Sequence, residues 1–141
     1  MAIPCYLCLF KHNMEMSSRP GIKPVVWIGS TRADLAAFPE DVKDAMGYAL
    51  YVAQLGGKHS DAKPLHGFGG AAILEIIEDH EGDTFRAVYT VRFAGRTYVL
   101  HAFQKKSKAG IKTPKHQIEL IRSRLKRAEE EHARWIEARK G

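Results

Sequence analysis

Cysteine is scarce in this chain: its 141 residues include two, Cys5 and Cys8, separated by two positions. Two cysteines do not make the disulfide framework of a small secreted domain, so we expect a reducing cytoplasm. A redox Cys-x-x-Cys would follow a strand of a βαβ unit, which is not indicated here. A zinc site would need a fourth ligand besides these two cysteines and His12. We therefore expect no metal and no other cofactor.

Long hydrophobic runs are also missing. The apolar stretch 2–10 is much shorter than the roughly 20 residues that cross a bilayer, and it lacks the basic start and cleavage site of a signal peptide. We therefore expect no contact with a membrane. Residues 1–23 are assigned as an N-terminal extension, and its first dozen residues are interpreted as a variable extension, a misplaced start or an added edge strand. The length predicts one domain, which we assign to residues 24–141.

Excess positive charge is missing from the first three quarters of the chain and concentrated in the last. Residues 1–104 contain 10 Lys and Arg against 11 Asp and Glu, whereas residues 105–141 contain 12 against 5. The net charge of +6 therefore arises entirely in the last 37 residues. Such asymmetry indicates an anionic partner, with nucleic acid as the leading interpretation and a solvated basic helix as the alternative.

The hydrophobic pattern predicts an α+β domain with the element order β-α-α-β-β-β-α. An apolar run at 25–28 predicts a buried strand. A short helix capped by Ser30 or Thr31 should follow, then a second helix that has Pro39 at its first position and stops at Gly56 and Gly57. Strands at 71–78, 84–93 and 97–105, joined by short polar or glycine-containing turns, predict an antiparallel meander. A last helix should begin at Thr113 and Pro114.

Side-chain alternation along the meander predicts which residues share a face. If Ala94 and Gly95 form a two-residue turn, Val88 lies opposite His101 and Arg86 opposite Phe103, with Lys105 one diagonal step from Arg86. A three-residue loop would instead turn His101 to the apolar face.

We favour the two-residue turn because it places Leu100 and Tyr98 on the same face as Tyr89 and Val91. The opposite face then carries Arg86, His101 and Lys105 and is expected to be open to solvent.

Arginine, histidine and lysine on one open face suit the cleavage of an RNA phosphodiester. Arg86 would bind phosphate oxygens and Lys105 would stabilise the negative charge of the transition state. His101 would carry the proton, and Phe103 would stack on a base. The RNA 2′-hydroxyl would be the nucleophile. The alternative is that His101 has only a structural role, although a charged Arg86 within a strand must be solvated or paired.

The basic last helix has alternatives of its own. Lys115, Arg122 and Lys126 form a stripe beside its apolar face, and Lys108 and Lys112 extend this stripe into the preceding loop. The stripe can bind an RNA backbone or an acidic segment of a partner protein, or it is simply solvated.

Two segments resemble the RelE/ParE superfamily of toxin–antitoxin toxins. They are Phe85-Arg86-Ala87-Val88-Tyr89 and Leu100-His101-Ala102-Phe103-Gln104-Lys105-Lys106-Ser107. The second segment, followed by a helix start at Lys112-Thr113-Pro114, is most similar to the HigB-like, phage-derived branch. The resemblance extends over roughly residues 24–128.

This resemblance implies a ribosome-dependent mRNA endonuclease, an mRNA interferase of the cytoplasm, that cuts mRNA in the ribosomal A site and is silenced by a helix-turn-helix antitoxin. Arg86 matches the phosphate-binding arginine of the family, and Lys105 and Lys106 match its basic or catalytic position at the strand end. Lys63 matches an RNA-binding loop.

The chain departs from the pattern of its relatives in one respect, because it has no tyrosine after Tyr98. The general base is therefore expected to be His101 or, second, His66. Two other functions stay open: a ParE-like topoisomerase inhibitor without nuclease activity, and a non-toxic phage-derived nucleic-acid-binding protein.

Overall fold

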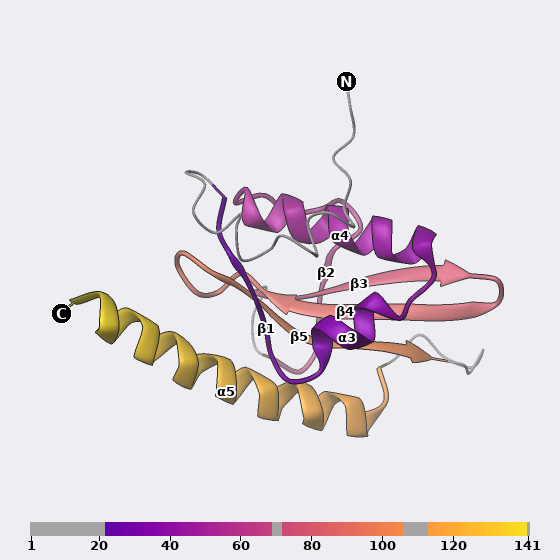
Figure 1. The fold of residues 1–141 in the computed structure, drawn as a ribbon. Coiled ribbons are helices and arrows are strands. Elements are labelled where there is room, and N and C mark those ends of the chain that lie inside the picture. The colour runs from indigo at the N-terminus through magenta and orange to yellow at the C-terminus, as the bar shows by residue number, and fades with distance from the viewer. Residues whose placement is uncertain (1–21, 69–71, 106–112, 141) are drawn as a thin grey trace.

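The computed structural model describes residues 22–68, 72–105 and 113–140 (Figure 1). They form the expected α+β fold: a five-stranded sheet in the order β1-β5-β4-β3-β2, with helices on both faces. In chain order the elements are β1 (Val25–Trp27), α3 (Thr31–Ala36), α4 (Glu40–Gln54), β2 (Lys63–Pro64), β3 (Ile73–His80), β4 (Asp83–Thr90), β5 (Thr97–Lys105) and α5 (Lys115–Lys140).

The predicted element order is confirmed apart from β2, which lies in a segment that we took for a loop. Lys63 and Pro64 pair with Glu75 and Leu74 of β3 at the edge of the sheet. A proline is compatible with an edge strand because its missing N–H costs no hydrogen bond on the solvent side. A strand of two residues, one of them proline, has no alternating pattern in the sequence, so β2 was not predicted.

The bounds of the two middle strands differ from the prediction. β3 runs to His80, which pairs with Asp83, so only Glu81 and Gly82 form the turn. Both have positive φ angles, 49° and 86°, as a tight hairpin requires. β4 ends at Thr90, whereas the prediction extended it to residue 93.

The helix boundaries agree with the capping signals to within about two residues. Ser30 precedes α3, and its hydroxyl donates to the Asp34 carboxylate at 2.7 Å. Pro39 is the N-cap of α4 and not its first helical residue. Gly56, with φ of 90°, follows the end of α4 and reverses the chain. The start of α5 at Lys115 follows the predicted Thr-Pro signal.

The predicted two-residue turn between β4 and β5 is wrong, but half of the register that it implied is right. Residues 91–96 connect the strands, and a β-bulge compensates for the longer loop, since Tyr89 pairs with Val99 whereas Val88 pairs with His101. Leu100 is the extra residue of the bulge. Arg86 therefore does lie opposite Phe103, while Thr90 lies opposite Tyr98 and not Val99.

Two cores lie on opposite faces of the sheet. The first lies beneath α3 and α4 and includes Leu35, Met46, Phe85, Tyr89 and Val99. The second lies beneath α5 and includes Val88, Tyr98, Leu100, Ile121 and Ala128. Because of the bulge, Tyr98 and Leu100 belong to the α5 side and not, as expected, to the side of Tyr89. The sheet face that was predicted to be open is therefore covered by α5, as Figure 1 shows.

Several predicted positions lie outside the described residues: Cys5 and Cys8, and the three lysines Lys106, Lys108 and Lys112. Among the described helices, none is both long and apolar enough to span a membrane.

Candidate functional site

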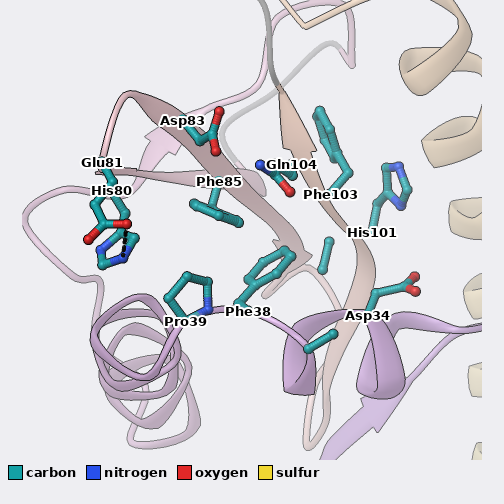
Figure 2. Close-up of a pocket in the computed structure, with 12 residues that line it drawn as sticks. Asp34, Phe38, Pro39, His80, Glu81, Asp83, Phe85, His101, Phe103 and Gln104 are labelled. Carbon is teal, nitrogen blue, oxygen red and sulfur yellow. Dashed lines mark ion pairs between the residues drawn. The ribbon is translucent and has the colours of Figure 1, made fainter.

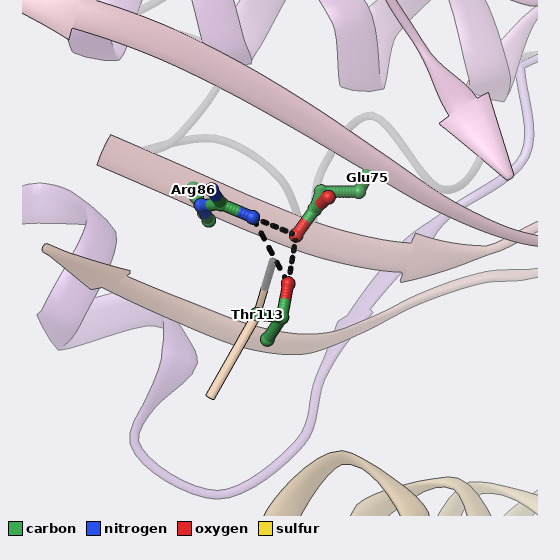
Figure 3. Close-up of polar contacts among 3 residues, drawn as sticks. All are labelled: Glu75, Arg86 and Thr113. Atoms are coloured by element: carbon green, nitrogen blue, oxygen red, sulfur yellow. Dashed lines mark hydrogen bonds and ion pairs between the residues drawn. The ribbon is translucent and has the colours of Figure 1, made fainter. Parts of the chain in front are cut away.

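Arg86 is at the centre of β4 and is buried, with 2% of its surface exposed. Its Nη1 lies 3.2 Å from Glu75 Oε2 and donates to Thr113 Oγ1 at 3.0 Å, while Thr113 donates to the same Glu75 oxygen at 2.9 Å (Figure 3). Glu75 neutralises the charge of Arg86, and Thr113 connects the pair to the segment before α5. Arg86 was expected on an open face; the structure instead places it beneath the start of α5, within an ion pair.

His101 is also buried, and both of its ring nitrogens have partners. Nδ1 lies 3.0 Å from Nη1 of Arg124, and Nε2 contacts the Gln117 side-chain oxygen. Because a guanidinium can only donate, Nδ1 must accept, and the proton lies on Nε2. Burial lowers the pKa of His101; the Gln117 hydrogen bond raises it and Arg124 lowers it further. The ring is thus a neutral connector between β5 and α5.

Arg124 connects three elements, although the sequence analysis did not single it out. Its Nη1 donates to the carbonyl of Leu100, the bulge residue, at 3.1 Å, and its Nη2 donates to Ser30 Oγ at 3.3 Å. Gly29 has a φ of 64°, which favours glycine, and a Cβ there would lie 3.1 Å from this guanidinium, closer than an ordinary contact. The signal in the sequence is the helical spacing of Gln117, Ile121 and Arg124, which predicts one shared face.

Phe103 was expected to stack on a base, but its ring already stacks on His101. The centroids of the two rings lie 4.7 Å apart with 20° between their planes, and 8% of Phe103 is exposed. Arg86, His101 and Phe103 thus form a buried framework that fixes the end of β5 against α5.

The more accessible basic residues lie around this framework. Lys105 is half-buried at the end of β5, and Lys115 and His116 are exposed in the first turn of α5. The first helical backbone bonds of α5 are donated by Gln117 and Ile118 to Pro114. The N–H groups of Lys115 and His116 therefore precede the hydrogen-bonded part of the helix, at the positive end of its dipole. Such a helix start favours phosphate.

The other predicted RNA-binding residues lie elsewhere. Lys63 and His66 are exposed on and after β2, and Arg122 donates to the Gly67 carbonyl at 2.8 Å and lies over Phe68. β2 and β5 are three strand spacings apart, about 14 Å. The predicted set therefore divides into two groups, one at β2 and one at the end of β5 and the start of α5.

A hollow of about 700 Å³ lies beside β5, on the far side of Phe103 from α5 (Figure 2). The rings of Phe38 and Phe85 pack edge to face in this hollow, with their centroids 4.9 Å apart. The titratable residues that line it are Asp34, His80, Glu81, Asp83 and His101. Since three of these are carboxylic acids, the hollow repels a phosphate. Bound phosphate is therefore expected at the start of α5 and not in this hollow.

The buried His101 makes stability depend on pH. Its pKa is lowered in the folded protein, so the unfolded chain binds more protons as pH falls below about 6.5. The free energy of unfolding is therefore expected to decrease as the pH falls from 7 towards the folded pKa, by at most about 1.4 kcal/mol per pH unit for one group. Urea unfolding at several pH values measures this.

The control for this prediction is His101→Gln, which can contact the same partners and does not titrate. It should reduce the pH dependence without removing it, because burial also lowers the pKa of His132. An unchanged dependence in His101→Gln would contradict the assignment of His101.

Comparisons with known proteins identify one family. The family model described as "Phage derived protein Gp49-like (DUF891)" matches residues 33–126. No curated protein and no solved structure matches the chain. The matched range includes the framework around Arg86 and His101 and the first half of α5, and it ends before the second half of α5.

Proposed function

Since the chain belongs to the Gp49-like family of phage-derived proteins, we propose that it is the toxin of a type II toxin–antitoxin system and cleaves mRNA on the ribosome. The family is associated with RelE-like toxins, and the α+β fold is consistent with theirs. Within that superfamily we assign the chain to the HigB-like branch, on the strand-end sequence of residues 101–106.

The observation that carries the proposal is the set of basic side chains near the start of α5. Lys115 and the exposed His116 lie at the positive end of this 26-residue helix. Lys105 follows by four residues His101, which contacts Gln117 in the first turn of the helix. The buried contacts of Arg86 and of His101 fix β5 and α5 relative to each other at this point. A preorganised cationic surface of this kind stabilises the extra negative charge of a phosphoryl transition state.

We assign the reaction as attack of the RNA 2′-hydroxyl on the adjacent phosphorus. The new O2′–P bond displaces the 5′-oxygen, which takes up a proton from water, so that the products are a 2′,3′-cyclic phosphate and a 5′-hydroxyl. Lys105 and the start of α5 bind the phosphate oxygens. His116, and not His101, removes the proton from the 2′-hydroxyl, because His116 is exposed whereas both ring nitrogens of His101 are engaged.

This assignment predicts different effects for the two histidines. His116→Gln should lower the rate of mRNA cleavage by about 10²–10⁴-fold, as the loss of a general base does, and should leave stability unchanged. His101→Gln should change cleavage much less. Both are measured on an mRNA translated in a reconstituted system, with circular dichroism as the test of folding. If His101→Gln has the larger effect on cleavage, the roles are reversed.

The expected partner is a helix-turn-helix antitoxin, since Gp49-like proteins usually occur in toxin–antitoxin pairs. We propose that it neutralises the toxin by covering the exposed cations of α5. The ribosome and its mRNA are the proposed targets.

Induction of the protein in bacteria tests the function against its main alternative. An mRNA endonuclease arrests the incorporation of labelled amino acids while DNA synthesis continues at first. A ParE-like topoisomerase inhibitor instead blocks replication and damages DNA while mRNA stays intact. Harmless overexpression without an antitoxin would contradict both and favour a non-toxic nucleic-acid-binding protein.

A further inference from the structure

The second half of α5 lies beyond the range matched by the family model and packs on the connection between β4 and β5. Trp135 lies over Gly95, where a Cβ would come within 3.0 Å of the indole. Gly95 has a φ of 84°, so both its conformation and the space above it require glycine. His132 lies one helical turn before Trp135, and its Nδ1 is 3.0 Å from the Tyr98 hydroxyl oxygen. This end of the helix is therefore docked on the sheet.

Two arginines from different parts of the chain lie against Trp135. The Cζ atoms of Arg96 and Arg139 each lie 4.6 Å from the centre of the indole ring. Arg96 also donates to the Tyr98 hydroxyl at 3.4 Å. Stacking on the indole restricts the planes of both guanidinium groups.

Neither arginine forms an ion pair with a carboxylate in the part of the chain that the structure describes. Two other arginines do: Arg92 pairs with Glu129 at 3.2 Å, and Arg127 with Glu131 at 3.5 Å. Two positive charges near one ring repel each other, and an anion bound to both would offset that repulsion. Planar guanidinium groups bind phosphate oxygens bidentately, which a lysine cannot do.

We propose that Arg96, Trp135 and Arg139 form a clamp for an RNA phosphodiester, separate from the cleavage site. The choice of RNA as the polyanion rests on the proposed function. Trp135 is 18 residues after Gln117, which corresponds to about 27 Å along the helix. The clamp therefore contacts a phosphate several nucleotides away from the scissile bond, or one of the ribosomal RNA.

Binding of a fluorescent single-stranded RNA of about 20 nucleotides tests the clamp by anisotropy, at several salt concentrations. Arg139→Gln should weaken binding about tenfold and lower the salt slope by about 0.7, as the loss of one phosphate contact predicts. Arg139→Lys keeps the charge but loses the planar group, so it should give an intermediate affinity. Arg139 is exposed near the end of α5, so these changes should leave the fold intact.

The matched control is Arg134→Gln, which removes the same charge from an exposed position of the same helix. It should change RNA affinity by less than about twofold if the clamp is specific, because the guanidinium groups that lie over the Trp135 ring are those of Arg96 and Arg139 and not that of Arg134. Equal weakening by Arg134→Gln and Arg139→Gln, or no RNA binding by the parent, would overturn the clamp.

The clamp and the proposed function can fail separately. If mRNA is cleaved on ribosomes but Arg139→Gln binds RNA like the parent, the clamp alone is wrong. If Arg139→Gln weakens RNA binding but no mRNA is cleaved, the clamp stands as a nucleic-acid site and the nuclease assignment is wrong.

Discussion

Arg86→Ala is expected to lower the free energy of unfolding by about 3–5 kcal/mol, because it leaves the buried Glu75 carboxylate without its counter-charge. Glu75 has an exposed fraction of 8%, so water cannot replace the guanidinium. Urea unfolding followed by circular dichroism measures the change. The exposed pair of Arg92 and Glu129 is the control, since Arg92→Ala should cost less than about 1 kcal/mol.

The double variant Glu75→Leu with Arg86→Met separates a structural role from a functional one. Replacing a buried ion pair by apolar residues of similar size is often close to neutral, so the double variant should recover at least half of the lost stability. If it folds but no longer cleaves mRNA, the pair of Arg86 and Glu75 contributes to function beyond stability. If Arg86→Ala is as stable as the parent, the ion pair does not stabilise the fold. Loss of toxicity in Arg86→Ala alone therefore does not assign a contact with RNA.

Lys105→Ala is expected to lower the rate of mRNA cleavage by about 10²–10³-fold, the usual effect of removing one group that stabilises transition-state charge. Lys105 follows the buried Phe103 by two residues on the same strand face, so its backbone is fixed while its side chain is half-buried at the strand end. Stability should change little. Cleavage of a translated mRNA, followed over time by primer extension, gives the rate.

Lys58→Ala is the matched control for Lys105→Ala. Lys58 is exposed in the loop after α4 and carries the same charge, so its replacement should leave cleavage within about twofold of the parent. A Lys105→Ala protein that cleaves at the parental rate would remove Lys105 from the site.

The fold could be predicted from the sequence where local signals decide it. Ser30, Pro39, Gly56 and the Thr113-Pro114 start marked the helices, because caps and glycine stops act within a few residues. The bounds of β5 were predicted as observed. The bulge at Leu100 was not predicted, because its carbonyl accepts a hydrogen bond from Arg124, 24 residues away. The alternation of side chains along a strand carries no information about a contact between residues so far apart in the sequence.

The position of α5 was the second unpredicted feature, and it changed the site most. The face of Val88 was expected to be open because Arg86 and His101 share it. Both residues can nevertheless be buried. Glu75 neutralises the charge of Arg86, and Thr113 accepts a hydrogen bond from it. Gln117 and Arg124 contact the two ring nitrogens of His101. Such pairing depends on tertiary structure. Polar residues on a strand face therefore did not show that the face was exposed.

The chemistry of the mRNA ends tests the central claim most directly. The parent protein is added to a reconstituted translation reaction, and the cleaved mRNA is mapped and its ends are identified. The account predicts breaks only in mRNA that is being translated, with a 2′,3′-cyclic phosphate on one side and a 5′-hydroxyl on the other, and very few in His116→Gln. Intact mRNA in a reaction that contains the folded parent protein would contradict the account.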